Sequence, residues 1–362
     1  MLLTMLLAGV PAKALDYDLR GQLSAYHLEA RRDGERVHGS GIRYIPIFEL
    51  AQELPGAAFI DIEASLNAWA ATGSYMDDDY DAELYRLKLR FATARSETRL
   101  GLQKINFGPG RLLRPLRWFD RLDPRDPLQI TEGVYALRFR YTAQNNTNLW
   151  LWGLYGNDEP KGYEMLPSAD DRPELGGRLQ IPAGPGELAV TAHNRLAEPP
   201  LRFLHNIEET RIALDGRWDI HIGLWFEAVL QRQESEELET TWSETLMIGT
   251  DYTFGIGSGL HLLVEHMATG VTREFPEPDW IEDSHMSAFM VGYPIGYLDY
   301  VQAIGYYDWE NDDYYQFASW QRTWDNLALN LSFFHNPERT GAGLASAMTA
   351  GTGGQIILLY NH

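Results

Sequence analysis

Apolar and polar residues alternate along most of this chain, in segments of about ten residues. In 327–333, leucine or phenylalanine occupies every odd position and alanine, asparagine or serine every even one. The segments 60–66, 85–91 and 135–141 alternate in the same way, and their polar positions mostly carry formal charge. Because successive side chains of a strand point to opposite faces, this period of two predicts strands with one apolar and one polar face. No sustained helical period is visible, so we expect an all-β fold.

Eighteen segments of this kind predict about eighteen strands. They lie near 19–30, 37–50, 57–71, 82–93, 97–107, 133–143, 147–156, 174–182, 187–195, 206–214, 217–230, 240–254, 259–270, 284–293, 296–307, 313–323, 326–335 and 354–361.

The connections between these segments alternate between short and long. The short turns lie at 54–56, 95–97, 145–147, 184–186, 215–216, 255–257, 294–296 and 324–326. Most of the others are longer and acidic, at 72–81, 157–173, 231–239, 271–284 and 307–313. This alternation is typical of a transmembrane antiparallel up-and-down β-barrel, which has short periplasmic turns and long extracellular loops. We therefore expect one barrel of 16–18 strands over residues 15–362, with both termini on the periplasmic side.

A soluble β-sandwich or propeller would also alternate, because one face of each of its sheets meets water. Three features favour the membrane barrel. The segments are longer than the roughly five or six residues of most soluble strands. Aromatic residues gather at the segment ends, where the girdles of a membrane barrel lie. No repeat of propeller-blade length is visible.

Composition excludes several classes of function. The chain has 30 Lys+Arg against 51 Asp+Glu, a formal net charge of -21, which disfavours nucleic acid as a partner. It has no cysteine, which excludes disulfides and thiolate chemistry. Residues 1–14 join a short apolar run to Ala12-Lys13-Ala14 and predict a signal peptide. We expect an exported protein of the cell outer membrane, in contact with lipid and lipopolysaccharide.

The segment 99–141 carries the most specific residues. It runs from a strand through a Gly-Pro-Gly break and an Arg/Pro-rich stretch into the next strand. It resembles Gram-negative outer-membrane porins of the alginate-export and phosphate-selective type. The matching residues are Gln103, Asn106, Gly108, Gly110, Pro115, Phe119, Asp120, Pro124, Gly133 and Val134. The resemblance implies that the loop 108–132 folds into the lumen and narrows the pore.

Basic residues gather in and around this loop, although the chain as a whole is acidic. If the apolar faces of the flanking strands meet lipid, their cations must face the lumen, since an arginine on the lipid face costs about 2–4 kcal/mol at the midplane. Asp61, Glu63 and Glu227 fall on polar faces and supply the opposite sign. Pairing that stiffens the barrel is an alternative role for these arginines, compatible with pore lining. The candidate pore-lining residues are Arg86, Lys88, Arg90, Arg111, Arg114, Arg117, Arg121, Arg125, Arg138, Arg140, Asp61 and Glu63.

Other chemistry finds little support. The histidines lack the spacing of a metal pair, and no G-x-S-x-G nucleophile motif occurs, so we expect no enzyme, metal or cofactor. Two classes of function remain. The first is a porin, a passive diffusion channel for small hydrophilic solutes, especially carboxylates, sugar acids or phosphates. The second is a structural sleeve around a periplasmic partner such as a multihaem cytochrome. The sequence leaves the oligomeric state open.

Overall fold

The computed structural model describes residues 15–74, 76–199, 205–235, 240–275, 281–337 and 350–362. The predicted signal peptide lies outside these residues. The described parts of the chain form eighteen β-strands, and no helix among them is long and apolar enough to cross a membrane. The strands are β1 (Asp16–Arg32), β2 (Glu35–Leu54), β3 (Ala58–Gly73), β4 (Met76–Ala92), β5 (Ser96–Gln103), β6 (Val134–Thr142), β7 (Asn148–Leu154), β8 (Glu174–Ala183), β9 (Gly186–Ala197), β10 (Ile207–Asp219), β11 (Gly223–Glu234), β12 (Thr241–Phe254), β13 (Leu260–Thr272), β14 (Glu282–Ile295), β15 (Asp299–Asp308), β16 (Asp313–Thr323), β17 (Leu327–Asn336) and β18 (Gly351–Asn361).

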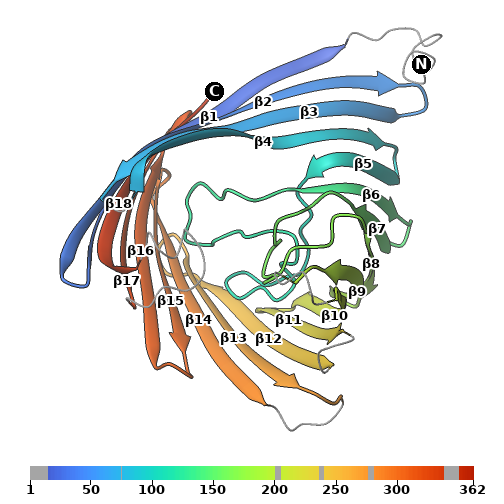
Figure 1. Ribbon diagram of the computed structural model, residues 1–362. Helices are drawn as coiled ribbons and strands as arrows, with labels where there is room; N and C mark the ends of the chain where they lie inside the picture. The colour runs from blue at the N-terminus through green and yellow to red at the C-terminus, as the bar shows by residue number, and fades with distance from the viewer. Residues whose placement is uncertain (1–14, 75, 200–204, 236–239, 276–280, 338–349) are drawn as a thin grey trace.

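Each strand pairs antiparallel with its neighbours in sequence, and β1 also pairs with β18, so the sheet closes into a barrel (Figure 1). The closing register joins Leu23 to Tyr360 and Ala25 to Leu358. Closure leaves no free edge at the seam, which is how antiparallel barrels avoid unpaired backbone groups. The prediction of an eighteen-stranded antiparallel barrel is confirmed.

The period of two separates the outside of the barrel from its inside. Tyr135, Leu137 and Phe139 are 44%, 52% and 36% exposed on the outer face, whereas Arg138 between them is 5% exposed. On β17, Phe333 is exposed and Asn330 is buried. The apolar rows therefore face outward and the charged rows face the lumen, as the sequence pattern predicts for a barrel in lipid.

The two rims of the barrel differ. The turns 55–57, 93–95, 143–147 and 184–185 lie on the same rim as the ends of the described chain, which we call the turn rim. The opposite rim, which we call the loop rim, carries the longer connections. It also carries the two-residue turn Asp33-Gly34, where both residues have positive φ (49° and 80°).

The predicted loop 72–81 is wrong, because β3 continues to Gly73 and β4 already begins at Met76. The acidic run 77–81 therefore belongs to β4 and not to a loop.

Two connections from the loop rim turn into the barrel. Figure 1 shows 104–133, between β5 and β6, and 155–173, between β7 and β8, inside the ring of strands. Their apolar side chains build two buried clusters. Leu112 and Leu113 pack with residues of β1 and β11–β17, and Leu116 and Phe119 pack with residues of β6, β7 and β10. The interior of the barrel is thus filled in part by its own loops.

Candidate functional site

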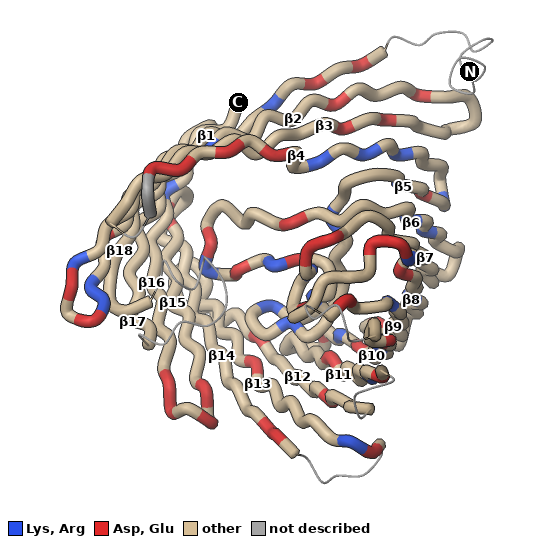
Figure 2. Tube along the Cα trace, viewed as in Figure 1, with Lys and Arg blue, Asp and Glu red and all other residues tan. Residues whose placement is uncertain are grey.

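Charged side chains line one side of the lumen, on β3–β6. The strand register places Asp61 opposite Arg90, Arg90 opposite Arg99, and Arg99 opposite Arg138. The charged run extends along β4 as well, and Figure 2 shows basic residues gathered on β4 towards its β5 end. We call the following nine residues the basic wall: Asp61, Glu63, Arg86, Lys88, Arg90, Glu97, Arg99, Arg138 and Arg140.

The basic wall contains six cations and three carboxylates, so its ion pairs do not cancel its charge. Lys88 Nζ lies 2.9 Å from Glu63 Oε2, and Arg90 Nε lies 2.6 Å from Asp61 Oδ2. Glu97 is shared by Arg99 at 2.9 Å and Arg138 at 2.7 Å. The side chains of Lys88, Arg90 and Arg99 stay 17%, 28% and 24% exposed. Positive charge therefore exceeds negative charge by three within these nine residues, and Glu49 of β2 and Glu83 of β4 lie beside them.

The loop 104–133 is held across the lumen by a buried carboxylate of β11. Glu227 accepts hydrogen bonds from the backbone N–H of Gly110 at 2.7 Å and of Leu116 at 3.0 Å. A Cβ on Gly108, where φ is +92°, would lie 2.5 Å from Glu227 Oε1, and one on Gly110 would lie 2.8 Å from it. The Gly-Pro-Gly break of the sequence thus lets the backbone approach this carboxylate.

A second buried carboxylate, on β13, binds the next turn of the loop. Glu265 accepts hydrogen bonds from the N–H groups of Arg111 (2.7 Å), Leu112 (2.8 Å) and Leu113 (2.6 Å), and from Trp225 Nε1 at 2.9 Å. Both glutamates have no exposed surface. Since buried N–H groups left unpaired are costly, these two side chains fix the path of the loop.

The five loop arginines differ in their surroundings. Arg111 is exposed, while Arg114 is 7% exposed and donates to Asn106 Oδ1 at 2.5 Å. Arg117 bonds to the hydroxyl of Tyr163, and its guanidinium lies 4.8 Å from that ring. Arg121 donates to the carbonyls of Gly162 (2.8 Å) and Pro160 (2.9 Å). Arg114, Arg117 and Arg121 are thus bound within the loops, which fits the stiffening role for them.

The fifth arginine lies where the loop reaches the far side of the barrel. Arg125 binds both oxygens of Asp123, and its guanidinium lies 6.0 Å from the ring of Tyr306 on β15. Burial opposes ionisation of Asp123, but the hydrogen bonds and charge of Arg125 hold the pKa of Asp123 below its ordinary value. Leu128 packs beside Ile357 and Leu359 of β18. The loop therefore crosses from β5 to the opposite wall.

The strand cations adjoining the loop are also placed. Arg86 donates to the carbonyl of Thr131 at 2.8 Å and to its hydroxyl at 2.7 Å, so it ties β4 to the end of the loop. Arg140 donates to Asn148 Oδ1 at 3.2 Å and lies 5.1 Å from the ring of Trp150. The structure brings the predicted residues of β3, β4 and β6 together on one wall, and Arg121 of the loop lines a cavity together with Arg86.

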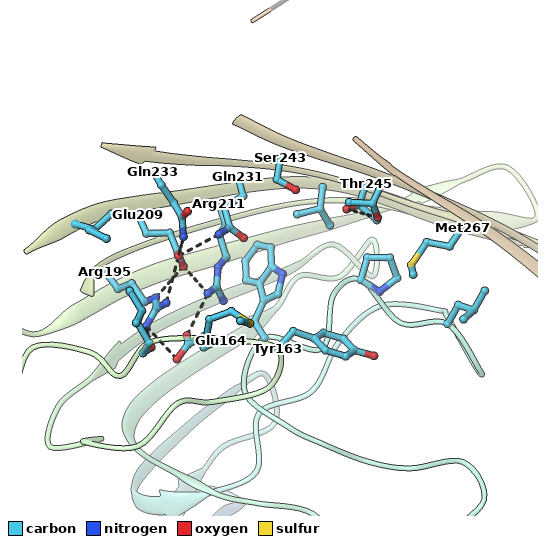
Figure 3. Close-up of a pocket in the computed structure, with 18 of the residues that line it drawn as sticks. Tyr163, Glu164, Arg195, Glu209, Arg211, Gln231, Gln233, Ser243, Thr245 and Met267 are labelled. Carbon is cyan, nitrogen blue, oxygen red and sulfur yellow. Dashed lines mark hydrogen bonds and ion pairs between the residues drawn. The ribbon is translucent and has the colours of Figure 1, made fainter. Parts of the chain in front are cut away.

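A second charged cluster lies on β8–β10 and the loop 155–173. Arg178 binds Asp215 through both terminal nitrogens, at 2.5 and 2.8 Å. Arg195 and Arg211 each bridge Glu164 and Glu209 (Figure 3). Every side chain here is at most 6% exposed. The eight residues, which we call the balanced wall, are four cations and four carboxylates: Lys161, Glu164, Glu174, Arg178, Arg195, Glu209, Arg211 and Asp215.

Sequence reasoning missed the balanced wall and the role of Glu265. The predicted exterior loop 157–173 contains Lys161 and Glu164, which are buried against β8–β10 inside the ring. The sequence does carry a signal for the balanced wall, because charged residues recur at the inward-facing positions of neighbouring strands. On β10, Glu209, Arg211 and Asp215 alternate with Thr210 and Ile212.

Comparisons with known proteins support the fold. No protein-family model matches the sequence, and no curated protein matches it. The structure resembles an anion-selective porin from Comamonas acidovorans, with a TM-score of 0.54 at 11% identity, covering 96% of this chain and 100% of that chain. It also resembles OccAB1 from Acinetobacter baumannii (TM-score 0.61, 9% identity, 98% of each chain). A third is OccK5 (OpdH) from Pseudomonas aeruginosa (TM-score 0.57, 10% identity, 95% of this chain and 98% of that one). The chain has the fold of outer-membrane porins.

Proposed function

We propose that the protein is an outer-membrane porin, a passive diffusion channel that favours small anionic solutes such as carboxylates, sugar acids or phosphates. The observation that carries this proposal is the charge of the basic wall, six cations against three carboxylates, of which the cations Lys88, Arg90 and Arg99 keep partial exposure. Guanidinium groups bind carboxylate and phosphate through paired N–H donors, and a row of them lets an anion pass from one to the next.

The net charge of -21 does not contradict anion preference. Ions screen exposed charges beyond about 8–10 Å at physiological salt, so acids at the rims act weakly on an ion inside. Selectivity is decided where the path is narrow and low-dielectric walls focus the nearby field. The loop 104–133 crosses the lumen and narrows the space beside the basic wall in this proposal, whereas a sleeve needs an interior open to its partner. The finer assignment to the alginate-export or phosphate-selective type stays a prediction.

The test is the reversal potential of single channels in planar bilayers under a KCl gradient. The informative variant combines Arg99→Gln with Arg140→Gln, because every carboxylate of the wall then keeps a cation. Asp61 retains Arg90, Glu63 retains Lys88 and Glu97 retains Arg138. We expect anion preference in the wild type and a shift towards cations in the double variant.

A matched control removes a cation outside the lumen. Arg322 lies opposite Leu329 on the outward row of β16 and β17, and its guanidinium is 5.5 Å from the ring of Trp324. Arg322→Gln should leave the reversal potential unchanged. A cation-selective wild type, or a double variant with the wild-type reversal potential, would overturn the anion-channel proposal.

A further inference from the structure

A cavity of about 500 Å³ lies in the half of the lumen nearest the loop rim, on the side away from the basic wall. Its walls come from β9–β14, and Leu113, Pro115 and Trp118 of the loop line it as well. Small-molecule sites commonly have volumes of about 300–1,000 Å³ and combine an apolar lining with a few polar groups. The cavity fits that description, and the anion-channel proposal does not use it.

The charged groups at this cavity are already neutralised. Arg195 lies 3.1 Å from Glu164 and 2.8 Å from Glu209, and Arg211 lies 3.2 Å from Glu164 and also binds Glu209. Both arginines are already paired with both glutamates. An anionic solute would therefore have to displace a buried carboxylate before it could bind either arginine. The cost of desolvating its charge would then go uncompensated.

Uncharged polar groups form a stripe along the adjacent strands. The register sets Gln231 opposite Ser243, and Thr245 opposite Thr269, whose hydroxyl lies 3.1 Å away. Gln231 and Gln233 donate their amide N–H to Glu209, at 3.1 and 2.7 Å, so their amide oxygens are not used in those bonds. Figure 3 shows Gln231, Gln233, Ser243 and Thr245 together along the strands. Such a stripe both donates to and accepts from hydroxyl groups.

The opposite side of the cavity is apolar and aromatic. Tyr163 is 59% exposed and lies across the cavity from the stripe (Figure 3). Met267 and Met286 line the cavity on β13 and β14, beside the stripe, and methionine adapts its shape to a bound ring. A wholly apolar solute would leave the amides and hydroxyls of the stripe unpaired, whereas an aromatic side chain such as Tyr163 suits a solute with one apolar face.

We propose that this cavity binds an uncharged polyhydroxylated ring, a neutral mono- or disaccharide, through hydroxyl contacts to the stripe and packing against Tyr163. This site goes beyond the anion preference of the channel and lies on residues separate from the basic wall. A sugar bound here occupies the outer part of the lumen and interrupts ion flow.

The experiment measures block of single-channel current by maltose, with glucuronate as the charged probe. Ser243→Trp fills the cavity, and Gln231→Leu removes one amide at similar size while Glu209 keeps Arg195, Arg211 and Gln233 as donors. We expect concentration-dependent block of the wild type by maltose and weaker block by glucuronate. Each variant should raise the apparent Kd for maltose by roughly tenfold.

Two controls separate this site from the basic wall and from misfolding. Leu246→Trp adds the same side chain to β12 on its outer face, where Leu246 is 52% exposed, and should keep wild-type block. The Arg99→Gln/Arg140→Gln variant should shift the reversal potential and keep maltose block. The proposal is overturned if maltose does not block, if Gln231→Leu and Ser243→Trp both keep wild-type block, or if glucuronate binds more tightly than maltose. A changed reversal potential alone would bear on the anion channel and not on this site.

Discussion

The basic wall and the balanced wall are both rich in arginine, yet they differ in charge balance and in exposure. The basic wall has twice as many cations as carboxylates, and several of its cations stay between 17% and 28% exposed. The balanced wall has equal numbers, and each of its side chains is at most 6% exposed. The strand residues of both walls lie on lumen-facing rows of the same barrel, and Lys161 and Glu164 of the balanced wall come from the loop 155–173.

This difference indicates which arginines can act on solutes. A buried ion pair costs desolvation energy and is retained only with close partners, so it fixes structure and offers little to a passing ion. An exposed cation in excess keeps part of its field for the lumen. Arginine count alone therefore does not identify a pore lining. A pore lining is identified by charge that remains after ion pairing and by exposure to the lumen.

Removing the loop's anchor should have the largest effect, because the loop contacts both walls, through Thr131 at Arg86 and through Trp118 at Arg211. Glu265→Leu leaves three backbone N–H groups and the indole N–H of Trp225 without their acceptor. Each buried unpaired donor costs about 1–3 kcal/mol, so the loop should leave its position. We expect a higher single-channel conductance and a lower midpoint of thermal unfolding, measured on purified protein in bilayers and in detergent.

Glu265→Gln is the matched control for the anchor. It keeps one acceptor oxygen at the same position, so its conductance should lie between those of the wild type and Glu265→Leu. Wild-type conductance in Glu265→Leu would show that Glu227 and apolar packing suffice to hold the loop without this side chain.

The walls should next respond in opposite ways to loss of one carboxylate. Glu209→Leu leaves Arg195 and Arg211 with Glu164 alone, and removal of one partner from a buried pair costs about 3–5 kcal/mol. Denaturant unfolding should show that loss, with the reversal potential little changed. Glu63→Gln frees the partly exposed Lys88, so it should destabilise the barrel less than Glu209→Leu does and should increase anion preference.

Far-UV circular dichroism and electrophoretic mobility of unheated samples verify that both variants are folded before these measurements. If Glu63→Gln destabilises the barrel as strongly as Glu209→Leu does, or if Glu209→Leu shifts selectivity more than Glu63→Gln does, the two walls are not functionally distinct.

The strands were predictable because the alternation of apolar and polar residues shows which face of each strand lies on the outside of the barrel. In 135–141 that period survives at every position, and Arg138 and Arg140 face the lumen as expected. The bounds of loops were less accessible. An acidic run such as 77–81 can belong to a loop or to a strand that continues past the membrane, and local composition does not distinguish the two.

The site was predictable in its residue types and less so in its partners. Arg90 and Asp61 could be assigned to polar faces, but their pairing depends on strand register, which links positions 29 residues apart. The contact of Glu265 with Leu113 spans 152 residues, and no local pattern encodes it. Gly108 and Gly110 marked a place of close approach without revealing what approaches. Long-range partners decide which charges remain uncompensated.

The smallest expected effect is the salt dependence of selectivity, and it tests the proposed cause of that selectivity. The Debye length is about 10 Å at 0.1 M and 3 Å at 1 M, so the field of partly exposed cations should reach less of the lumen as salt increases. At a fixed gradient ratio, anion preference of the wild type should fall between these concentrations. The anion preference of the wild type should approach that of Arg99→Gln/Arg140→Gln, which lacks two of the contributing cations.

The loss of stability in Glu209→Leu should change little over the same range of salt, because Arg195 and Arg211 are almost wholly shielded from solvent ions. If anion preference is independent of salt, selectivity arises from direct contact of dehydrated solutes with guanidinium groups, and the excess field of the basic wall is not its cause.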